Sequence, residues 1–265
     1  MAYTYAELLK AYEALGVSAG RTVYVTSDLG RLMDYEVREK QAVMEAHHRA
    51  LASLIGDTGT IVVPTASTNL CNTEIVFDPN RTPSYQVGSF SEYVRQLPDA
   101  RRSFHPFVSY AAIGPNTGRI VENVSRHAFG PETPEARMIE LDALGVSIGK
   151  HPRFTCSTVH HVEMAMGVPY RYAKEYAHPV WRDGIVGREE FYQYVWYRDI
   201  GLNRDGNRRL FQHLSKVLDL RELELGRGRV YSYPLAEFYR QATKLFAGDI
   251  YLWCETPPTI RPYAR

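Results

Sequence analysis

Strand-length apolar runs alternate with helix-like patterns along this chain, and that alternation limits its fold more than any other feature. Residues 22–27 (TVYVTS) and 60–65 (TIVVPT) are short and rich in β-branched side chains, as in buried strands. Between them, about residues 35–55 carry the pattern of a helix. Because strand, helix and strand in succession are typical of a sheet covered by helices, the sequence predicts an α/β fold.

The alternation continues towards the C-terminus without an internal repeat or a flexible linker. Residues 66–87 form an irregular stretch, and loops of this length usually have a functional or binding role. Asp183-Gly184 predicts a hairpin turn. We expect one domain over residues 1–265, with an aromatic-rich C-terminal part (about 170–265) as a candidate subdomain. Helices are also expected at 88–97 and 234–246, strands at 107–114 and 229–234, and a helix leading into a strand within 136–149.

Composition and charge disfavour several classes of protein. Lysine plus arginine (31) nearly equals aspartate plus glutamate (30), so no global field favours nucleic acid or an anionic membrane. No apolar stretch is long enough to span a bilayer, and the N-terminus lacks the pattern of a secretory signal. Thr4 and Glu7 instead predict a capping box. Cys71, Cys156 and Cys254 form no C-x-x-C pair, so we expect a reducing, cytoplasmic setting.

Several common catalytic motifs are missing from the sequence. It contains no G-x-x-x-x-G-K-[ST] or G-x-G-x-x-G after a strand, no G-x-S-x-G and no H-E-x-x-H. His160 and His161 are adjacent, and neighbours on a helix point about 100° apart, which disfavours a shared metal ion. We therefore expect no metal site.

The segment CSTVHHVEMAMGVPY (156–170) holds the strongest candidates for chemistry. His160 and Glu163 are three residues apart, which places them on one face of a helix. A neutral imidazole, with a reference pKa of about 6.5, is suited to take a proton from an attacking amine. The spacing alone leaves three alternatives open: a metal site, a general-base pair, or an ordinary helix whose polar residues face water.

Five segments occur in an order that points to one family. They are VYVTSDLG (23–30), GTIVVPTAS (59–67), the long stretch 76–114, FGPETP (129–134) and STVHHVE (157–163). The long stretch contains T-P-S, a G-x-x-x-E-x-x-R pattern and R-S-x-H-P, and STVHHVE matches T-x-x-H-x-x-E with serine in the first place. Together these segments resemble the antibiotic N-acetyltransferase family, whose best-known members acetylate the 3-amino group of aminoglycosides. The resemblance covers about residues 15–172.

The resemblance implies an α/β/α fold with a mixed central sheet, acetyl-coenzyme A as donor and an amine as acceptor. His160 matches the family's catalytic histidine, so we expect it to be the general base. Glu163 is expected to orient the imidazole or to hold the acceptor's ammonium group. Glu92 has two readings: a catalytic carboxylate that orients His160 or binds the acceptor, or the second half of a capping box begun by Ser89.

The resemblance also implies contacts with the two substrates. Arg102 and Ser103, in the R-S-x-H-P turn, are expected to bind coenzyme A, whose phosphates suit an arginine fork and turn amides. His105 in the same turn is either a cofactor contact or structural. Ser27 at the end of a strand is expected beside the thioester, and Asp28 beside the acceptor. Many family members have a histidine and two serines here, so a structural turn is the alternative.

The acceptor and the assembly remain open at this point. Aminoglycosides are polycations, so a chain without bulk acidity mildly favours another amino sugar, a nucleotide-linked amino sugar or another biosynthetic amine. A catalytically silent, sugar-binding member is the remaining alternative, and a homodimer is left open. Cys156 lies four residues before His160, but a thioester reacts directly with amines. We therefore expect single-step transfer without an acyl-enzyme.

Overall fold

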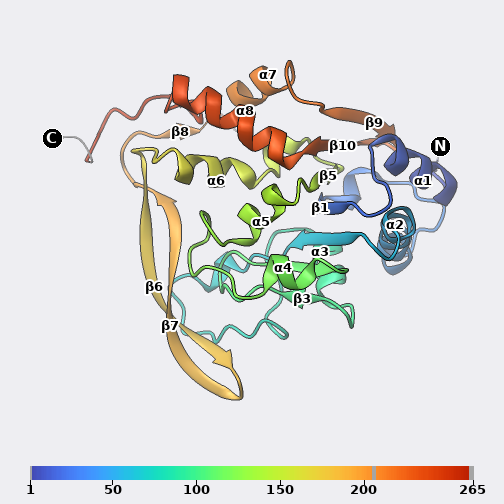
Figure 1. Ribbon diagram of the computed structural model, residues 1–265, viewed down its shortest axis with the longest axis horizontal. Helices are drawn as coiled ribbons and strands as arrows, with labels where there is room; N and C mark the ends of the chain where they lie inside the picture. Colours follow the sequence, from blue (N-terminus) through green and yellow to red (C-terminus); the bar gives the residue numbers. More distant parts are fainter. Residues whose placement is uncertain (1, 205–206, 263–265) are drawn as a thin grey trace.

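A mixed seven-stranded sheet forms the centre of the computed structural model, which describes residues 2–204 and 207–262 (Figure 1). Its strands lie in the order β3 (Arg101–Arg102), β4 (Tyr110–Ile113), β2 (Thr60–Pro64), β1 (Thr22–Ser27), β5 (Leu144–Ile148), β10 (Gly228–Pro234) and β9 (Arg221–Leu225). β1 is parallel to β2 and β5, and the outer pairs are antiparallel. Three neighbouring strands therefore end at the same edge of the sheet.

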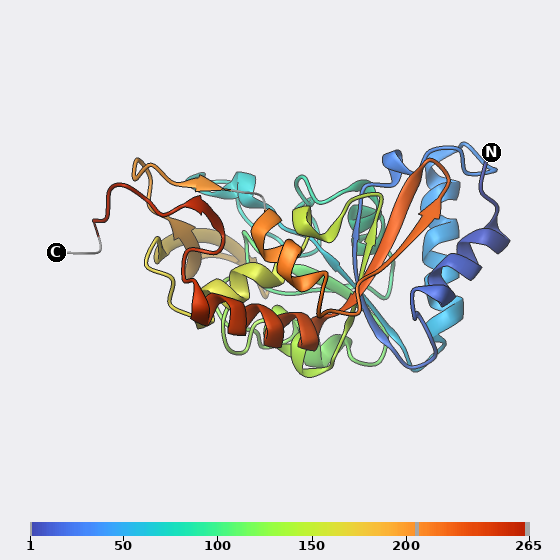
Figure 2. The ribbon, with the colours of Figure 1, turned by 90° about the horizontal axis from the view of Figure 1, so that it is seen from above.

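Helices cover both faces of this sheet. One layer contains α1 (Tyr5–Ala14), α2 (Lys40–Ile55) and α3 (Ser89–Arg95), and the other contains α4 (Thr117–Val121), α5 (Pro134–Glu140), α6 (Thr158–Ala165), α7 (Arg208–Leu214) and α8 (Leu235–Gly248). Along β1, Val23 and Val25 pack in the first layer's core, whereas Tyr24 packs in the second. In Figure 2, α1 and α2 lie on the opposite side of the sheet from α8. The expected three-layer α/β/α fold is confirmed.

A long hairpin extends from the layered body. Its strands, β6 (Arg171–Arg182) and β7 (Ile185–Trp196), pair along their full length. Asp183 and Gly184 join them with positive φ values of 52° and 85°, which confirms the predicted hairpin turn. Figure 1 shows the hairpin reaching well beyond the helices. Val180 in the hairpin bridges to Phe77, so the strands cover the irregular stretch at 66–87.

The aromatic-rich C-terminal part is divided between two places in the fold. β9 and β10 complete the central sheet, and α8 packs beside α6. The hairpin lies outside that sheet, as does a short pair of strands, β8 (Asn203–Arg204) and β11 (Cys254–Thr256). This part of the chain thus contributes both to the main body and to its margin.

The two helix predictions made near the N-terminus are only partly confirmed. Thr4 and Glu7 form the predicted capping box of α1. The helix expected from about residue 35 begins at Lys40 instead, because Tyr35 is held in a β-bridge with Tyr3 and the Glu36 amide donates to the Tyr3 carbonyl oxygen. Within the described residues, no helix has both the length and the apolar character needed to cross a membrane.

Candidate active site

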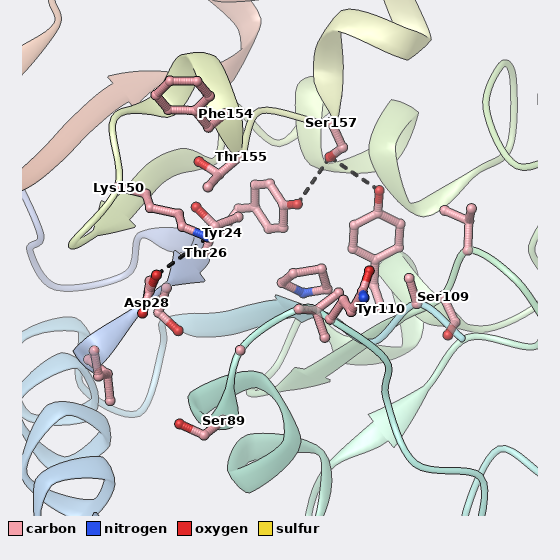
Figure 3. Close-up of a pocket in the computed structure, with 18 of the residues that line it drawn as sticks. Tyr24, Thr26, Asp28, Ser89, Ser109, Tyr110, Lys150, Phe154, Thr155 and Ser157 are labelled. Atoms are coloured by element: carbon pink, nitrogen blue, oxygen red, sulfur yellow. Dashed lines mark hydrogen bonds and ion pairs between the residues drawn. The ribbon is translucent and has the colours of Figure 1, made fainter. Parts of the chain in front are cut away.

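A pocket of about 630 Å³ opens at the edge of the sheet where β1, β2 and β5 end (Figure 3). In open α/β sheets, ligands bind outside the carboxyl ends of parallel strands. Ser27 and Asp28 line this pocket from the end of β1, Ala66 from the segment after β2, and Lys150 and Ser157 from the segment after β5. The strand order thus brings together side chains that lie far apart in the sequence.

Ser27 and Asp28, for which the sequence predicts substrate contacts, both line the pocket. Ser27 is buried, and its hydroxyl has no hydrogen-bond partner among the described residues. Gly88 packs directly against it: with φ at +93°, a Cβ there would lie 2.4 Å from the Ser27 carbonyl oxygen. Asp28 forms ion pairs with Arg31 (3.0 Å) and Lys150 (3.4 Å). The carboxylate is therefore partly neutralised before any ligand binds.

His160 and Glu163 meet on one face of α6, as their spacing predicts. His160 Nδ1 lies 2.7 Å from Glu163 Oε2, and the Tyr170 hydroxyl donates to Glu163 Oε1 at 2.8 Å. The Glu163 side chain is fully buried, whereas 32% of the His160 side chain is exposed. Burial opposes ionisation of Glu163, but the hydrogen bond from His160 and the charge of Arg171 outweigh it and lower its pKa. The geometry is that of a carboxylate holding an accessible imidazole.

Arg171 completes this centre, and no sequence motif predicted it. Its Nε lies 3.0 Å from Glu163 Oε2, aligned as an ion pair rather than a hydrogen bond, and its Nη2 lies 3.1 Å from His160 Nδ1. Arg171 comes from β6, so helical spacing does not connect it with α6. The available signal was indirect: a buried carboxylate needs a cation, but the sequence does not show that Glu163 is buried.

His160 lies at the margin of the pocket. The Phe129 ring lines the pocket and packs edge-on against the imidazole, with ring centroids 5.5 Å apart. Ser157, which also lines the pocket, precedes α6 by one residue and lies one turn before His160. The imidazole and the pocket therefore adjoin, and a ligand that extends past Phe129 reaches both.

His161 has different neighbours from His160. Its Nδ1 accepts a hydrogen bond from the Gly130 amide at 3.3 Å, and its ring packs edge-on against Tyr239. Burial lowers the pKa of His161 to about 4. The two histidine side chains therefore lie in different environments, as their adjacent positions on a helix predict. In the part of the chain that the structure describes, no cluster of three His, Cys, Asp or Glu side chains has an arrangement suited to a metal ion.

Glu92 fastens a loop to α3. Its carboxylate accepts hydrogen bonds from the Ser84 amide and hydroxyl, from Arg95 and from Gln96. Partial burial opposes its ionisation, but the bonds from Arg95 and Ser84 outweigh this and lower its pKa to about 2. The capping-box reading is wrong, because the cap of α3 is Gly88 and no side chain caps this helix. The bonds hold Glu92 in a structural role, and it is absent from the lining of the pocket at the sheet edge.

The R-S-x-H-P turn is directed into the protein rather than into the pocket. Arg102 donates to the carbonyl oxygens of Thr82 and Thr65 and to the Ser109 hydroxyl, and burial lowers its pKa to about 9. Ser103 is fully buried, with its hydroxyl accepting from the Tyr110 amide. This geometry does not support the expected contacts of Arg102 and Ser103 with coenzyme A. The two side chains instead join the turn to β4, to the residue that follows β2 and to the irregular stretch at 66–87.

His105 is also structural in this arrangement. Only 2% of the residue is exposed, and its Nδ1 accepts from the amides of Phe107 and Val108. Burial lowers the pKa of His105 to about 3, so the ring is neutral at physiological pH. Of the two readings given to His105, the geometry supports the structural one.

A buried carboxyl group that no sequence motif indicated borders the pocket. Glu135 is fully buried and accepts hydrogen bonds from Tyr110 (2.6 Å), Ser157 (3.0 Å) and Thr158. Tyr24 bonds to the same Ser157 hydroxyl at 3.0 Å, and Figure 3 shows both tyrosine hydroxyls converging on it. Burial raises the pKa of Glu135, against the opposing effect of the three hydroxyls. In sequence it is an ordinary acidic residue of a helix's first turn.

Comparison with known proteins supports the assignment that the motifs suggested. The family model described as aminoglycoside 3-N-acetyltransferase matches residues 25–247. Aminoglycoside N(3)-acetyltransferase III of Salmonella sp is 28% identical over 202 residues, which cover 69% of this chain and 68% of that protein. Aminoglycoside N(3)-acetyltransferase IX of Micromonospora chalcea is 29% identical over 171 residues, or 57% of this chain and 58% of that protein.

A solved structure described as AAC-IIIb binary with CoASH has the same fold, with a TM-score of 0.78 at 18% identity. The alignment covers 97% of this chain and 100% of that one. The fold likeness agrees with the family match, which extends over most of the chain from β1 to α8. This chain therefore belongs to the aminoglycoside 3-N-acetyltransferase family, a family of acyltransferases.

Proposed function

We propose that this chain is an acetyl-coenzyme A-dependent N-acetyltransferase that acts on a primary amine of an amino sugar, with His160 as general base. The observation that carries the proposal is the contact between His160 and the buried carboxylate of Glu163. It ties one imidazole nitrogen to a carboxylate and leaves the ring accessible beside a pocket large enough for a substrate.

The direction of this hydrogen bond defines which nitrogen is the base. An ionised carboxylate has no proton to donate, so the 2.7 Å contact requires a hydrogen on His160 Nδ1. Arg171 also has no lone pair, so its 3.1 Å contact with the same nitrogen competes with the bond to Glu163. The carboxylate is closer and oppositely charged to an imidazolium. In the neutral ring, Nε2 therefore carries the lone pair.

The reaction follows as a direct transfer. The acceptor nitrogen attacks the acetyl carbonyl of the thioester, and a C–N bond forms while His160 Nε2 takes the nitrogen's proton. The tetrahedral intermediate then expels the sulfur of coenzyme A as the C–S bond breaks, and His160 returns the proton to that sulfur. Cys156 takes no part in this scheme: burial raises the pKa of its thiol to about 12, which keeps it protonated.

The pocket at the sheet edge provides the place for the thioester. Ser27 lines this pocket and its hydroxyl has no hydrogen-bond partner among the described residues, so we assign to it the carbonyl oxygen of the thioester. The fold-related AAC-IIIb was solved with CoASH, which supports coenzyme A as the ligand. Because Arg102 is committed to internal bonds, we assign phosphate recognition instead to Lys150, which lines the pocket.

The acceptor is less constrained than the donor. Asp28 and Lys150 face the pocket as one acid and one base, 3.4 Å apart, which gives little attraction for a polycation. Although the relatives are named for aminoglycosides, the paired acid and base lead us to place monoamino and nucleotide-linked amino sugars ahead of aminoglycosides as acceptors. A catalytically silent sugar-binding protein is the alternative.

Thiol release from acetyl-coenzyme A across a panel of amines tests this proposal. We expect turnover with at least one amino sugar, a loss in kcat of about 10²–10⁴-fold for His160→Ala, and an active Cys156→Ser enzyme. An unchanged His160→Ala rate, or an acetylated enzyme that depends on Cys156, would reject the mechanism. Absence of thiol release with every amine, combined with stabilisation by a sugar, would favour the silent alternative.

A further inference from the structure

Arg171 lies in surroundings that are unusual for a guanidinium group. Its side chain is 3% exposed, and Nη1 donates to the Tyr194 carbonyl oxygen at 3.0 Å. The guanidinium carbon lies 4.6 Å from the ring centroid of Trp253, 5.5 Å from that of Trp196 and 5.7 Å from that of Tyr194. Aromatic faces stabilise a desolvated cation, and a guanidinium group is the cation best suited to such contacts. The protein thus holds a fixed positive charge beside its candidate base.

That charge opposes the effect of Glu163 on the imidazole. A carboxylate beside a histidine favours the imidazolium, whereas a guanidinium 3.1 Å from Nδ1 disfavours it. Three aromatic side chains among the described residues also contact this centre: Tyr170 donates to the Glu163 carboxylate, Tyr194 donates to the Glu163 backbone carbonyl oxygen, and Trp253 packs edge-on against His160. Burial raises the pKa of both tyrosines, that of Tyr194 to about 12. Cys254, next to Trp253, is fully buried.

A general base must be unprotonated when the acceptor arrives. With Glu163 alone, the imidazole would already hold a proton over part of the neutral range, and the enzyme would have to lose it before each turnover. We propose that Arg171 is a positioning residue that offsets the charge of Glu163 and thereby keeps His160 neutral and ready to accept the proton of the amine. The inference rests on the proposed role of His160 and assigns a further residue to it.

The first test is the pH profile of kcat/KM for Arg171→Met, which keeps an apolar stem among the aromatic rings and removes the charge. We expect the acidic limb of the profile to move to higher pH by about one to three units, while the limiting rate at high pH is retained within a few-fold. Arg171→Lys restores a cation and should return the limb towards its original position. Arg182→Met is the matched control: this arginine lies on the same strand but is exposed and paired with Glu189.

A purely structural role for Arg171 gives a different result. Loss of packing would lower the rate at every pH and leave the limb where it was, and that outcome would overturn the proposal. So would a limb that moves equally in Arg182→Met.

A second measurement does not depend on activity. In ¹⁵N spectra of the folded protein, His160 should titrate at higher pH in Arg171→Met than in the unmodified chain, with His160→Gln used to assign the signal. If Arg171→Met does not fold, Arg171→Gln replaces it as a neutral variant that retains hydrogen-bond donors. An unmoved titration of His160 overturns the inference even if acetyl transfer is confirmed. A moved titration supports it even if the acceptor remains unidentified.

Discussion

Glu135 and Glu163 are both fully buried carboxyl groups, and their partners set their pKa values in opposite directions. Glu163 lies against the guanidinium of Arg171 and accepts a hydrogen bond from His160, which together lower its pKa. Glu135 accepts only from hydroxyls and forms no ion pair in the described part of the chain, so burial dominates and raises its pKa. The neighbours of these two acids therefore shift their pKa values in opposite directions.

The raised pKa of Glu135 predicts how stability depends on pH. Between the unfolded and folded pKa values, the folded state binds more protons than the unfolded state, so Glu135 makes stability fall as pH rises through that window. Glu135→Gln cannot ionise and lacks this dependence. Urea unfolding should therefore show the stability of the unmodified chain, relative to Glu135→Gln, decreasing from acidic to neutral pH. Glu140→Gln, exposed on the same helix, is the control, and an increase with pH would contradict the prediction.

At the level of elements, the pocket depends on a close approach between the end of β1 and the loop that enters α3. Gly88 makes this approach with φ at +93°, and a Cβ would lie 2.4 Å from the Ser27 carbonyl oxygen. Backbone atoms cannot yield as a flexible side chain can. A side chain at position 88 must therefore displace Ser27 or the loop, and both line the pocket.

Gly88→Ala should consequently weaken acetyl-coenzyme A binding as well as the fold. The left-handed backbone and the clash together predict a loss of about 1–3 kcal/mol in unfolding free energy. Gly167→Ala is the matched control, because Gly167 has φ at +61° with nothing within 4 Å of the added Cβ. Urea unfolding and calorimetry with acetyl-coenzyme A measure both effects. Equal stability losses in the two variants, with unchanged affinity for the donor, would contradict this role of Gly88.

Across the whole molecule, the features that depend on regular local spacing were the ones that the sequence predicted. Buried strands such as 22–27, the hairpin turn at Asp183-Gly184 and the pairing of His160 with Glu163 depend on local spacing, and each was predictable. Arg171 reaches the centre because the chain turns at Gly167 between α6 and β6, and helical spacing does not encode a contact across that turn. Arg102 shows the opposite error: its motif predicted a contact with a ligand, but tertiary packing buries the side chain. Motif order identified the family, but burial determined which motif residues remain available to a ligand.

The charge balance of the whole chain leads to a prediction about the acceptor. Lysine and arginine exceed aspartate and glutamate by one, so no long-range field gathers polycations. We expect kcat/KM for a monoamino sugar to change less than about threefold between low and physiological salt, because the nearly balanced charges leave little net long-range attraction for salt to screen. The same assay with an aminoglycoside provides the comparison. A rise of about tenfold or more for the aminoglycoside as salt is lowered would reveal electrostatic capture of a polycation, and the acceptor preference proposed for this pocket would then be wrong.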